Sequence, residues 1–270
     1  MSNELVEGTS IDQTLYLRIL RYALCREMEL SDSVLVICGS VNDSKLFQYL
    51  GFTNVTISNI DERINELDNP FEPFAWSFQN AEALAFDDDH FDWVVVHAGL
   101  HHLKCPQLGI AEMIRVSRKG CIGIEPHESL LTRLGVMLGG GQQYETAAVQ
   151  ANDFEYGGVN NSCVPNFVYR WRKNEILKAA KSYEPAFNFQ YHFIYEMVLP
   201  GRLERLRNPL MRIGYGAIGR LISKFGRYVP ALSNNFAFLI QIQGAELQRW
   251  LVEEQGQVKP CAEYFEREYL

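Results

Sequence analysis

The sequence predicts an α/β fold in which helices cover both faces of a mostly parallel sheet. Short, almost wholly apolar runs, such as residues 34–38, alternate with segments of helical periodicity. Strands that are buried on both faces show such continuous runs, whereas half-exposed strands alternate apolar and polar residues. The chain has 270 residues, 47% of them hydrophobic, which is enough for one large core. We therefore predict a single domain over residues 1–270.

The first half of the chain provides these elements in order. Residues 11–30 place apolar side chains at helical spacing, so an amphipathic helix occupies most of 1–31; these side chains are Ile11, Leu15, Ile19, Tyr22 and Ala23. A strand at 34–38 is followed by a polar turn and a helix that Gly51 ends. Further elements follow: a strand ending at Asp61, a strand ending near His97, a helix with Leu108, Ala111 and Ile114 that stops at Lys119-Gly120, and a strand over 121–125.

The second half has weaker patterns and two insertions. We predict a helix at 174–183, a strand within 187–201 and a last strand at 235–244, before a charged C-terminal tail. Residues 126–170 are rich in Gly, Asn and Gln, which is typical of a mobile lid or substrate loop. Residues 201–230 hold seven basic side chains and one acid around an apolar helical stripe. Such a segment suits a cap over the site, a homodimer surface or a weak contact with an anionic membrane surface.

Composition excludes several classes of function. A net charge of −8 argues against nucleic acid as the main partner, because phosphate backbones demand a positive field. The six cysteines are scattered without a C-x-x-C pair, so we predict reduced thiols and neither a zinc knuckle nor a disulfide framework. The sequence shows no leader pattern and no run of about 18 to 20 apolar residues, which favours a cytoplasmic protein.

Four motifs between about residues 32 and 126 follow one another in a specific order. They read "VLVICGSVND", "NAEALAFDDDHFDWVVV", "HAGLHHL" and "EMIRVSRKGCIGIEP". In this order and spacing the chain resembles the class I S-adenosylmethionine-dependent methyltransferases, of the type called methyltransferase domain 11. The resemblance implies a Rossmann-like three-layer fold whose seven-stranded sheet ends in an antiparallel strand. It also implies S-adenosylmethionine as cofactor and methyl transfer to an oxygen or nitrogen of a small molecule.

The first motif departs from the family pattern. Val36 stands where the family has an acid, and Cys38 and Ser40 stand where glycines are common. Small side chains still leave room for the methionine part of the cofactor, and Asn42 or Asp43 can reach its amino group.

The predicted cofactor ligands lie near the carboxyl ends of the strands. A carboxylate after the second strand can accept hydrogen bonds from both ribose hydroxyls, so Asp61 is assigned to the ribose, with a helix cap as its alternative role. By resemblance, Asn80 and Ala81 face the adenine, and Asn80 stands where the family commonly has Asp. The full predicted set is Cys38, Gly39, Ser40, Asn42, Asp61, Asn80, Ala81 and His97.

Three histidines lie at the predicted carboxyl edge of the sheet, where ligands bind in open α/β folds. An imidazole there can take a proton from the acceptor or hold the acceptor in line. We assign catalysis to His97, His101 and Glu125, with His127 as a partner of Glu125, and leave His102 between a catalytic and a packing role. Three histidines within about one helical turn, without a nearby Cys or carboxylate pattern, are a poor ligand set, so we predict no metal.

Two other functions stay open. The departure in the glycine loop favours a methyltransferase-like binding or scaffold protein without cofactor. The strand-Gly-helix-Asp arrangement favours a nicotinamide oxidoreductase, although less strongly, because G-x-G-x-x-G is absent. For a methyltransferase, the basic segment at 201–230 suggests an anionic acceptor, such as a sugar-linked or lipid-linked metabolite.

Overall fold

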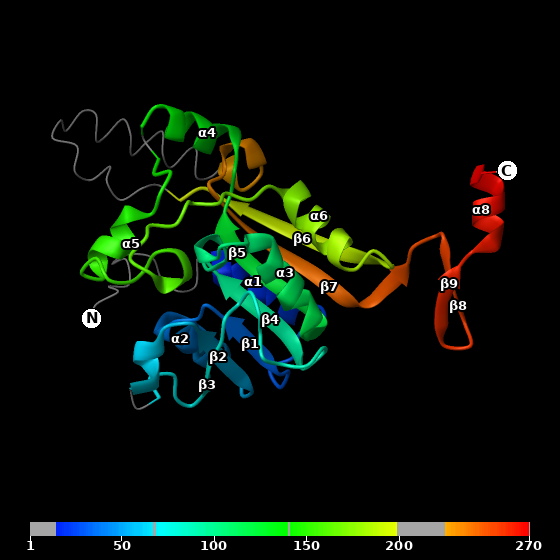
Figure 1. Cartoon of the computed structure of the whole chain (residues 1–270), viewed down its shortest axis with the longest axis horizontal. Coiled ribbons are helices and arrows are strands. Elements are labelled where there is room, and N and C mark those ends of the chain that lie inside the picture. The colour runs from blue at the N-terminus through cyan, green and yellow to red at the C-terminus, as the bar shows by residue number, and fades with distance from the viewer. Residues whose placement is uncertain (1–14, 67–68, 140, 199–224, 270) are drawn as a thin grey trace.

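Seven strands form one sheet at the centre of the molecule (Figure 1). The chain is described by a computed structural model over residues 15–66, 69–139, 141–198 and 225–269. The strands, in spatial order, are β3 (Ala75–Phe78), β2 (Val55–Asn59), β1 (Val34–Ile37), β4 (Phe91–His97), β5 (Ser117–Pro126), β7 (Asn235–Leu247) and β6 (Phe187–Glu196). The pairs from β3 to β5 are parallel, and β7 runs antiparallel to β5 and β6. The predicted mostly parallel sheet with a reversed last strand is confirmed.

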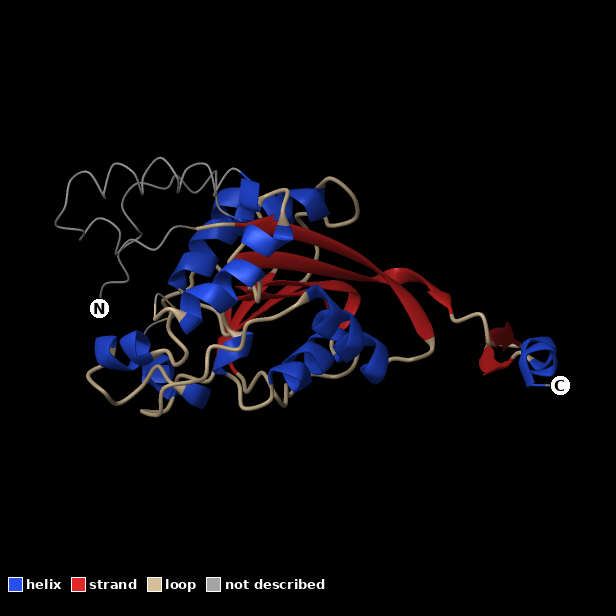
Figure 2. Cartoon of the chain, turned by 90° about the horizontal axis from the view of Figure 1, so that it is seen from above, coloured by secondary structure: helices blue, strands red, loops and turns tan. Residues whose placement is uncertain are grey.

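Helices pack on both faces of the sheet and form two cores (Figure 2). One face carries α1 (Leu15–Leu24) and α2 (Val41–Leu50), and the other carries α3 (Pro106–Arg115) and α6 (Lys173–Tyr183). In β1, Val34 and Val36 belong to the first core, and Leu35 and Ile37 belong to the second. Because successive side chains enter opposite cores, the whole strand is apolar, as a sheet covered on both faces requires.

Helix α2 begins inside the predicted polar turn. Ser40 is its N-cap, and the Ser40 backbone N–H and Oγ both donate to Oδ2 of Asp43, at 2.8 and 2.7 Å. This carboxylate satisfies groups that a helix start leaves unpaired. Gly51 ends the helix in the left-handed conformation (φ 85°), as the sequence predicted.

Several predicted boundaries are wrong. Strand β2 ends at Asn59, not at Asp61. Helix α3 ends at Arg115, and Gly120 lies inside β5, which begins at Ser117. The pair of histidines at 101 and 102 does not open α3, because these residues form the short 3-10 helix η3 (Leu100–His102) ahead of it. The edge strand β3 was not predicted, since none of its side chains is fully buried.

The buried face of α3 also differs from the predicted one. Ile110, Met113 and Ile114 are buried, whereas the predicted Leu108 is 43% exposed. The helix is therefore rotated from the predicted orientation, so that its apolar face meets the core around α6 and the sheet.

The insertion at 126–170 contains helices rather than only loop. They are α4 (Leu130–Met137), α5 (Thr146–Ala151) and the 3-10 helix η4 (Val159–Asn161). Most of the basic segment predicted at 201–230 lies outside the described residues, as does the first part of the N-terminal segment 1–31. The alternatives for the basic segment therefore stay predictions.

The C-terminal tail forms a small unit of its own. It contains the antiparallel hairpin of β8 (Leu251–Glu254) and β9 (Gln257–Pro260), followed by α8 (Ala262–Tyr269). This unit projects from the end of β7, away from the main sheet (Figures 1 and 2). Within the described part of the chain, no helix is long and apolar enough to cross a membrane.

Gly120 is required by close packing between β5 and β7 and not by a helix end. A Cβ at this position would collide with the backbone carbonyl oxygen of Ile240, and would lie 2.7 Å from the ring of Trp93. We predict that Gly120→Ala lowers the free energy of unfolding by about 1–3 kcal/mol, because neither the sheet backbone nor a fully buried indole can move freely. Urea unfolding followed by circular dichroism measures this change.

Gly135 in α4 is the matched control. A Cβ there would meet nothing within 4 Å, so Gly135→Ala should leave stability unchanged or raise it by about 0.5–1 kcal/mol. Equal free energies of unfolding for the two variants would contradict the close approach of β5 and β7.

Candidate active site

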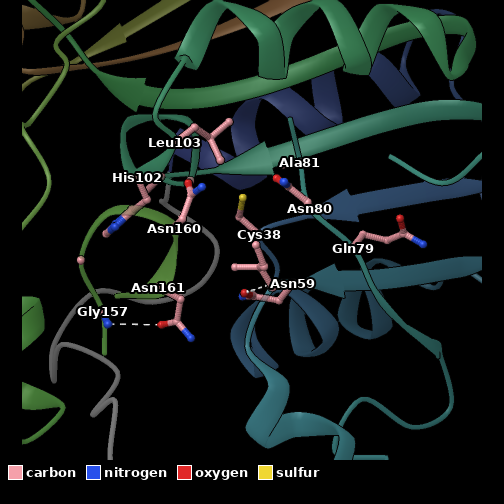
Figure 3. A pocket seen from close by; sticks show the side chains of 14 residues that line it. Cys38, Asn59, Gln79, Asn80, Ala81, His102, Leu103, Gly157, Asn160 and Asn161 are labelled. Carbon is pink, nitrogen blue, oxygen red and sulfur yellow. Dashed lines mark hydrogen bonds between the residues drawn. The ribbon is translucent and has the colours of Figure 1, made fainter. Parts of the chain in front are cut away.

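A pocket opens at the carboxyl edge of the sheet, between the loops that follow β1 and β4 (Figure 3). Strand order reverses between these two strands, and open α/β sheets bind ligands at such a point. The pocket measures about 670 Å³ including its open mouth. It is lined by Cys38, Asn59, Ile60, Gln79, Asn80, Ala81, Ala98, Gly99, His102, Leu103, Gly157, Gly158, Asn160 and Asn161.

Two loops with strained backbones form the base of the pocket. Cys38, directly after β1, and Ala98, directly after β4, both have φ of 52°, in the left-handed region that favours glycine. Gly99 brings the loops together, since a Cβ on it would lie 2.5 Å from Cβ of Cys38. Strain of this kind costs about 1–3 kcal/mol and tends to be retained where a ligand binds. Figure 3 shows the Cys38 sulfur pointing toward the middle of the pocket.

Asn59, the last residue of β2, joins the side of the pocket to its base. Its Nδ2 donates to the carbonyl of Gly39 at 3.0 Å, and its Oδ1 accepts from the backbone N–H groups of Ile60 and Asp61. Asp61 itself does not line the pocket. Its carboxylate accepts from Nε and the terminal guanidinium nitrogen of Arg63, at 2.8 and 2.6 Å, and this hydrogen bonding lowers the pKa of Asp61.

Side-chain amides dominate the polar lining, and none of the described lining residues carries a carboxylate. The amides belong to Asn59, Gln79, Asn80, Asn160 and Asn161. The Oδ1 atom of Asn160 is buried and has no hydrogen-bond partner among the residues that the structure describes. A buried acceptor without a partner is costly in a folded protein, so this atom is suited to receive a donor from a ligand.

The insertion closes one side of the pocket through residues 157–161. Asn160 donates from Nδ2 to Oε2 of Glu82 at 3.3 Å, and Glu82 also accepts from the backbone of Cys105. Nearby, the Arg63 guanidinium lies 4.0 Å from the centre of the Tyr156 ring. The segment predicted as a lid or substrate loop therefore contacts the loops that follow β2, β3 and β4.

Burial and nearby carboxylates both act on the Cys38 thiol at the base of the pocket. Burial, followed by the charges of Glu125, Asp43 and Glu82, raises the pKa of the Cys38 thiol to about 12. The thiol is therefore neutral at physiological pH, and a positively charged ligand group beside it is favoured.

Glu125 at the end of β5 fixes the loop after β4. The side chain is only 1% exposed, its Oε1 accepts from the backbone N–H groups of Gly99 and Leu100, and its Oε2 lies 2.8 Å from Nδ1 of His101. A buried carboxylate needs such partners, since an unpaired buried charge is strongly unfavourable. The loop that lines the pocket is thus held by one side chain of the neighbouring strand.

His101 and His102 meet a second carboxylate, Glu145, from the insertion. Oε2 of Glu145 lies 3.3 Å from Nε2 of His101 and 3.4 Å from Nε2 of His102. Burial by itself lowers the pKa of His101, but the charge and hydrogen bond of Glu125, together with Glu145, outweigh it and raise this pKa to about 9. The hydrogen bond from His101 in turn lowers the pKa of Glu145 to about 2, against the effect of burial. Burial and the charge of His101 lower the pKa of His102.

Residues 35–124 match the model of a protein family described as a methyltransferase domain. This span covers the four motifs except for the first residue of the first and the last two residues of the fourth, and it contains most of the residues around the pocket. This match covers 90 of the 270 residues, and over this segment the chain is similar to a methyltransferase domain. No curated protein sequence matches the chain.

Solved structures share the fold of this chain at low sequence identity. The YcgJ protein of Bacillus subtilis aligns with a TM-score of 0.50 and 15% identity, over 83% of this chain and 96% of its own. An S-adenosylmethionine-dependent methyltransferase of Mesorhizobium loti aligns with a TM-score of 0.50 and 11% identity, over 86% of this chain and all of its own. These matches show the Rossmann-like fold.

The residues of the pocket fit S-adenosylmethionine, which carries a positive sulfonium and a positive amino group. The carboxylates near Cys38 favour the sulfonium, and the Oδ1 atom of Asn160 can accept from an N–H or hydroxyl group. Asn59, Asn80 and Ala81 line the same pocket. When bound, the cofactor supplies an activated methyl group, so the protein has to provide mainly binding and alignment.

The structure brings some of the predicted site residues together and separates others. Cys38, Asn80 and Ala81 line the pocket, as predicted for cofactor ligands. Gly39 and Ser40 are not among the described lining residues, and Asn42 is exposed on α2. Asp61 is paired with Arg63. His97 is exposed, and its ring packs against that of Tyr16, with 4.7 Å between the ring centroids. Of the predicted catalytic residues, His101 and Glu125 are in contact through their side chains, and the His97 side chain does not take part in this contact. Their catalytic roles stay predictions.

Sequence reasoning missed several pocket residues. Asn59 was missed because the predicted second strand was extended to the acid at Asp61, whereas the strand "VTISN" ends two residues earlier, at Asn59. The residues at 157–161 have no signal beyond their richness in Gly and Asn. The sequence analysis expected no carboxylate near the histidines. This expectation is wrong, because Glu145 contacts His101 and His102 from an insertion that is distant in the sequence.

His127, two residues beyond Glu125 in the chain, should make folding depend on pH. It is 6% exposed and lies 2.6 Å from Oγ of Ser233, and burial lowers its pKa from 6.5 to about 4. The unfolded chain binds a proton at higher pH than the folded chain, so stability is lost as pH falls from 6.5 toward 4. Between pH 7.5 and 4.5 the loss should be about 2 kcal/mol larger for the native chain than for His127→Gln, measured by urea unfolding.

Exposed His90 supplies the control for this measurement. The variant His90→Gln should follow the native chain at both pH values. A His127→Gln variant with the native dependence on pH would contradict the assigned burial of a neutral imidazole.

Proposed function

We propose that the chain transfers the methyl group of S-adenosylmethionine to an oxygen or nitrogen of a small molecule that binds at the mouth of the pocket, beside His102. The proposal depends chiefly on one observation. The pocket lies where the loops after β1 and β4 meet, in the segment that matches the methyltransferase family, and His102 lines its wall. The acceptor therefore has an approach to the cofactor that passes an imidazole.

The residues of the chain act mainly by alignment. Methyl transfer proceeds when the attacking atom, the methyl carbon and the sulfur lie in line, so holding both reactants in place provides much of the rate increase. Gly99 and Leu103 border the pocket on the same loop as His102, and Glu125 holds this loop from β5. Because both ring nitrogens of His101 face carboxylates, we assign His101 and Glu125 a positioning role in this conformation.

The chemical class of the acceptor stays a proposal. A sugar-linked or lipid-linked anion was inferred from the basic residues at 201–230, most of which lie outside the described residues. A small molecule is favoured by the size of the pocket and by its partial closure through residues 157–161. Homodimer and membrane contacts likewise stay predictions for 201–230.

One observation favours the alternative of a binding protein that has lost the cofactor. The acid expected after the second strand, Asp61, is paired with Arg63. Two other positions where the family commonly has an acid hold Val36 and Asn80. Neutral side chains at these positions weaken the attraction for a cation and for ribose hydroxyls. The carboxylates near Cys38 and the unpartnered acceptor of Asn160 favour retained binding instead.

Isothermal titration with S-adenosylhomocysteine tests the cofactor site. We expect one binding site per chain, with Kd in the micromolar range. Asn59→Leu should raise Kd by at least about tenfold, because it removes the amide that links β2 to the loop after β1 and that borders the pocket.

Asn54→Leu is the matched control, since Asn54 is exposed and precedes the amino end of the same strand, away from the pocket. Its Kd should equal that of the native chain. The variant Asp61→Ala tests whether Asp61 or Asn59 contacts the ribose. We expect it to raise Kd less than Asn59→Leu does, because the Asp61 carboxylate is paired with Arg63. A larger increase for Asp61→Ala would contradict the role of Asn59, and no binding to the native chain at millimolar concentration would contradict the proposed function.

A further inference from the structure

A group of three ligand atoms converges beside the cofactor pocket. Nε2 of His101, Nε2 of His102 and Oε2 of Glu145 lie within 4.8 Å of one another. The two histidines come from η3, and Glu145 precedes α5 in the insertion. We propose that these three residues form a binding site for one divalent first-row transition-metal ion.

The spacing of the atoms agrees with metal coordination. Around a tetrahedral ion with bonds of about 2.0–2.1 Å, neighbouring ligand atoms lie about 3.4 Å apart. The Glu145 oxygen lies 3.3 and 3.4 Å from the two histidine nitrogens. Charge-assisted hydrogen bonds between such groups are shorter, about 2.7–2.9 Å, and the pair of His101 and Glu125 at 2.8 Å is one of them. The two separations at Glu145 therefore also suit a shared ion.

Glu125 provides the support that a metal-binding histidine usually has. A histidine that binds a metal through one ring nitrogen almost always donates its other ring N–H to a carboxylate or carbonyl, which fixes the ring. Nδ1 of His101 meets Glu125, and Nε2 is thereby directed toward Glu145 and His102. The backbone carbonyl of His101 is also held, since it accepts from Nδ2 of Asn166 at 3.0 Å.

The carboxylate ligand is held by backbone contacts of its own. The N–H of Glu145 donates to the carbonyl of Asn166, and an isolated antiparallel bridge joins the neighbouring residues Tyr144 and Phe167. Nδ2 of Asn166 lies 3.4 Å from Oε2 of Glu145. Because His101 and Glu145 are both held by neighbouring groups, these two ligands lose little freedom when an ion binds, and this favours affinity.

The ligand set indicates the class of ion and leaves part of its coordination free. Two imidazoles and one carboxylate suit Zn²⁺, Mn²⁺, Fe²⁺ or Co²⁺ rather than Ca²⁺ or Mg²⁺, which prefer oxygen alone. The side chains of His102 and Glu145 are 28% and 31% exposed, whereas that of His101 is 6% exposed. The open side can take water or a donor atom of another molecule, as sites with three protein ligands commonly do.

Metal binding is tested on the full chain without an affinity tag, after treatment with a chelator. We expect one equivalent of Mn²⁺ by electron paramagnetic resonance and of Zn²⁺ by isothermal titration, and Co²⁺ should give visible absorption bands. Mn²⁺ is included because it binds thiols poorly, so the free cysteines do not compete for it. His102→Gln and Glu145→Gln should each weaken binding by at least about tenfold.

Two control variants carry the same substitutions at exposed positions outside the cluster. His90→Gln and Glu155→Gln should bind each ion as the native chain does. Far-ultraviolet circular dichroism confirms that all four variants are folded. The proposal is overturned if the native chain binds none of the ions below millimolar concentration, or if the cluster variants and the controls bind equally well.

This proposal is independent of the proposed function, and the two can fail separately. Titration with S-adenosylhomocysteine in the presence of chelator measures the cofactor site without the ion. Metal binding without cofactor binding would support the metal site and contradict the methyltransferase site. Cofactor binding without metal binding would support the methyltransferase site and contradict the metal site.

Discussion

The buried carboxylate of Glu125 holds the arrangement on which the whole site depends. Its oxygens accept hydrogen bonds from two backbone N–H groups of the loop after β4 and contact the imidazole of His101 in the same loop. Glu125 itself lies at the end of the neighbouring strand β5. One side of this loop lines the cofactor pocket, and the other side presents His101 to Glu145. Because an unpaired carboxylate and three unpaired donors would all be costly in the interior, these groups fix one another. The pocket and the histidine cluster therefore share a single support.

The pocket differs from the family pattern in how it balances the positive charge of the cofactor. Acids are absent from its described lining, where amides such as those of Asn59 and Asn80 provide most of the polar groups. Negative charge is instead located behind the wall, where Glu125, Asp43 and Glu82 act on the Cys38 thiol. Buried carboxylates still exert a field over several ångströms, because a protein interior screens charge less than water does. The amides then supply directed hydrogen bonds, and the buried acids supply the potential.

Much of the fold follows from continuous apolar runs, which identified β1, β4 and the reversed strand β7. The edge strand β3 is only half buried and carries no such pattern. Cys38, Asn80 and Ala81 could be placed from motif order, since each lies within a short segment of fixed geometry. Asn59 was not predicted, because the ribose contact was assigned to the acid Asp61, two residues later. Glu145 has no local sequence signal, because only folding brings it close to the histidines. Single-sequence patterns identify buried strands well, but they describe strand ends and contacts from insertions poorly.

A crystal structure of the chain with S-adenosylhomocysteine tests the central claim, that an amide-lined pocket holds the cofactor. The account predicts density for the ligand between Cys38, Asn80 and the segment at 157–161, with the ribose hydroxyls within hydrogen-bond distance of the Asn59 amide. It also predicts that Asp61 remains paired with Arg63. An empty pocket at millimolar ligand, or a ribose bound by an Asp61 that has turned away from Arg63, would contradict it.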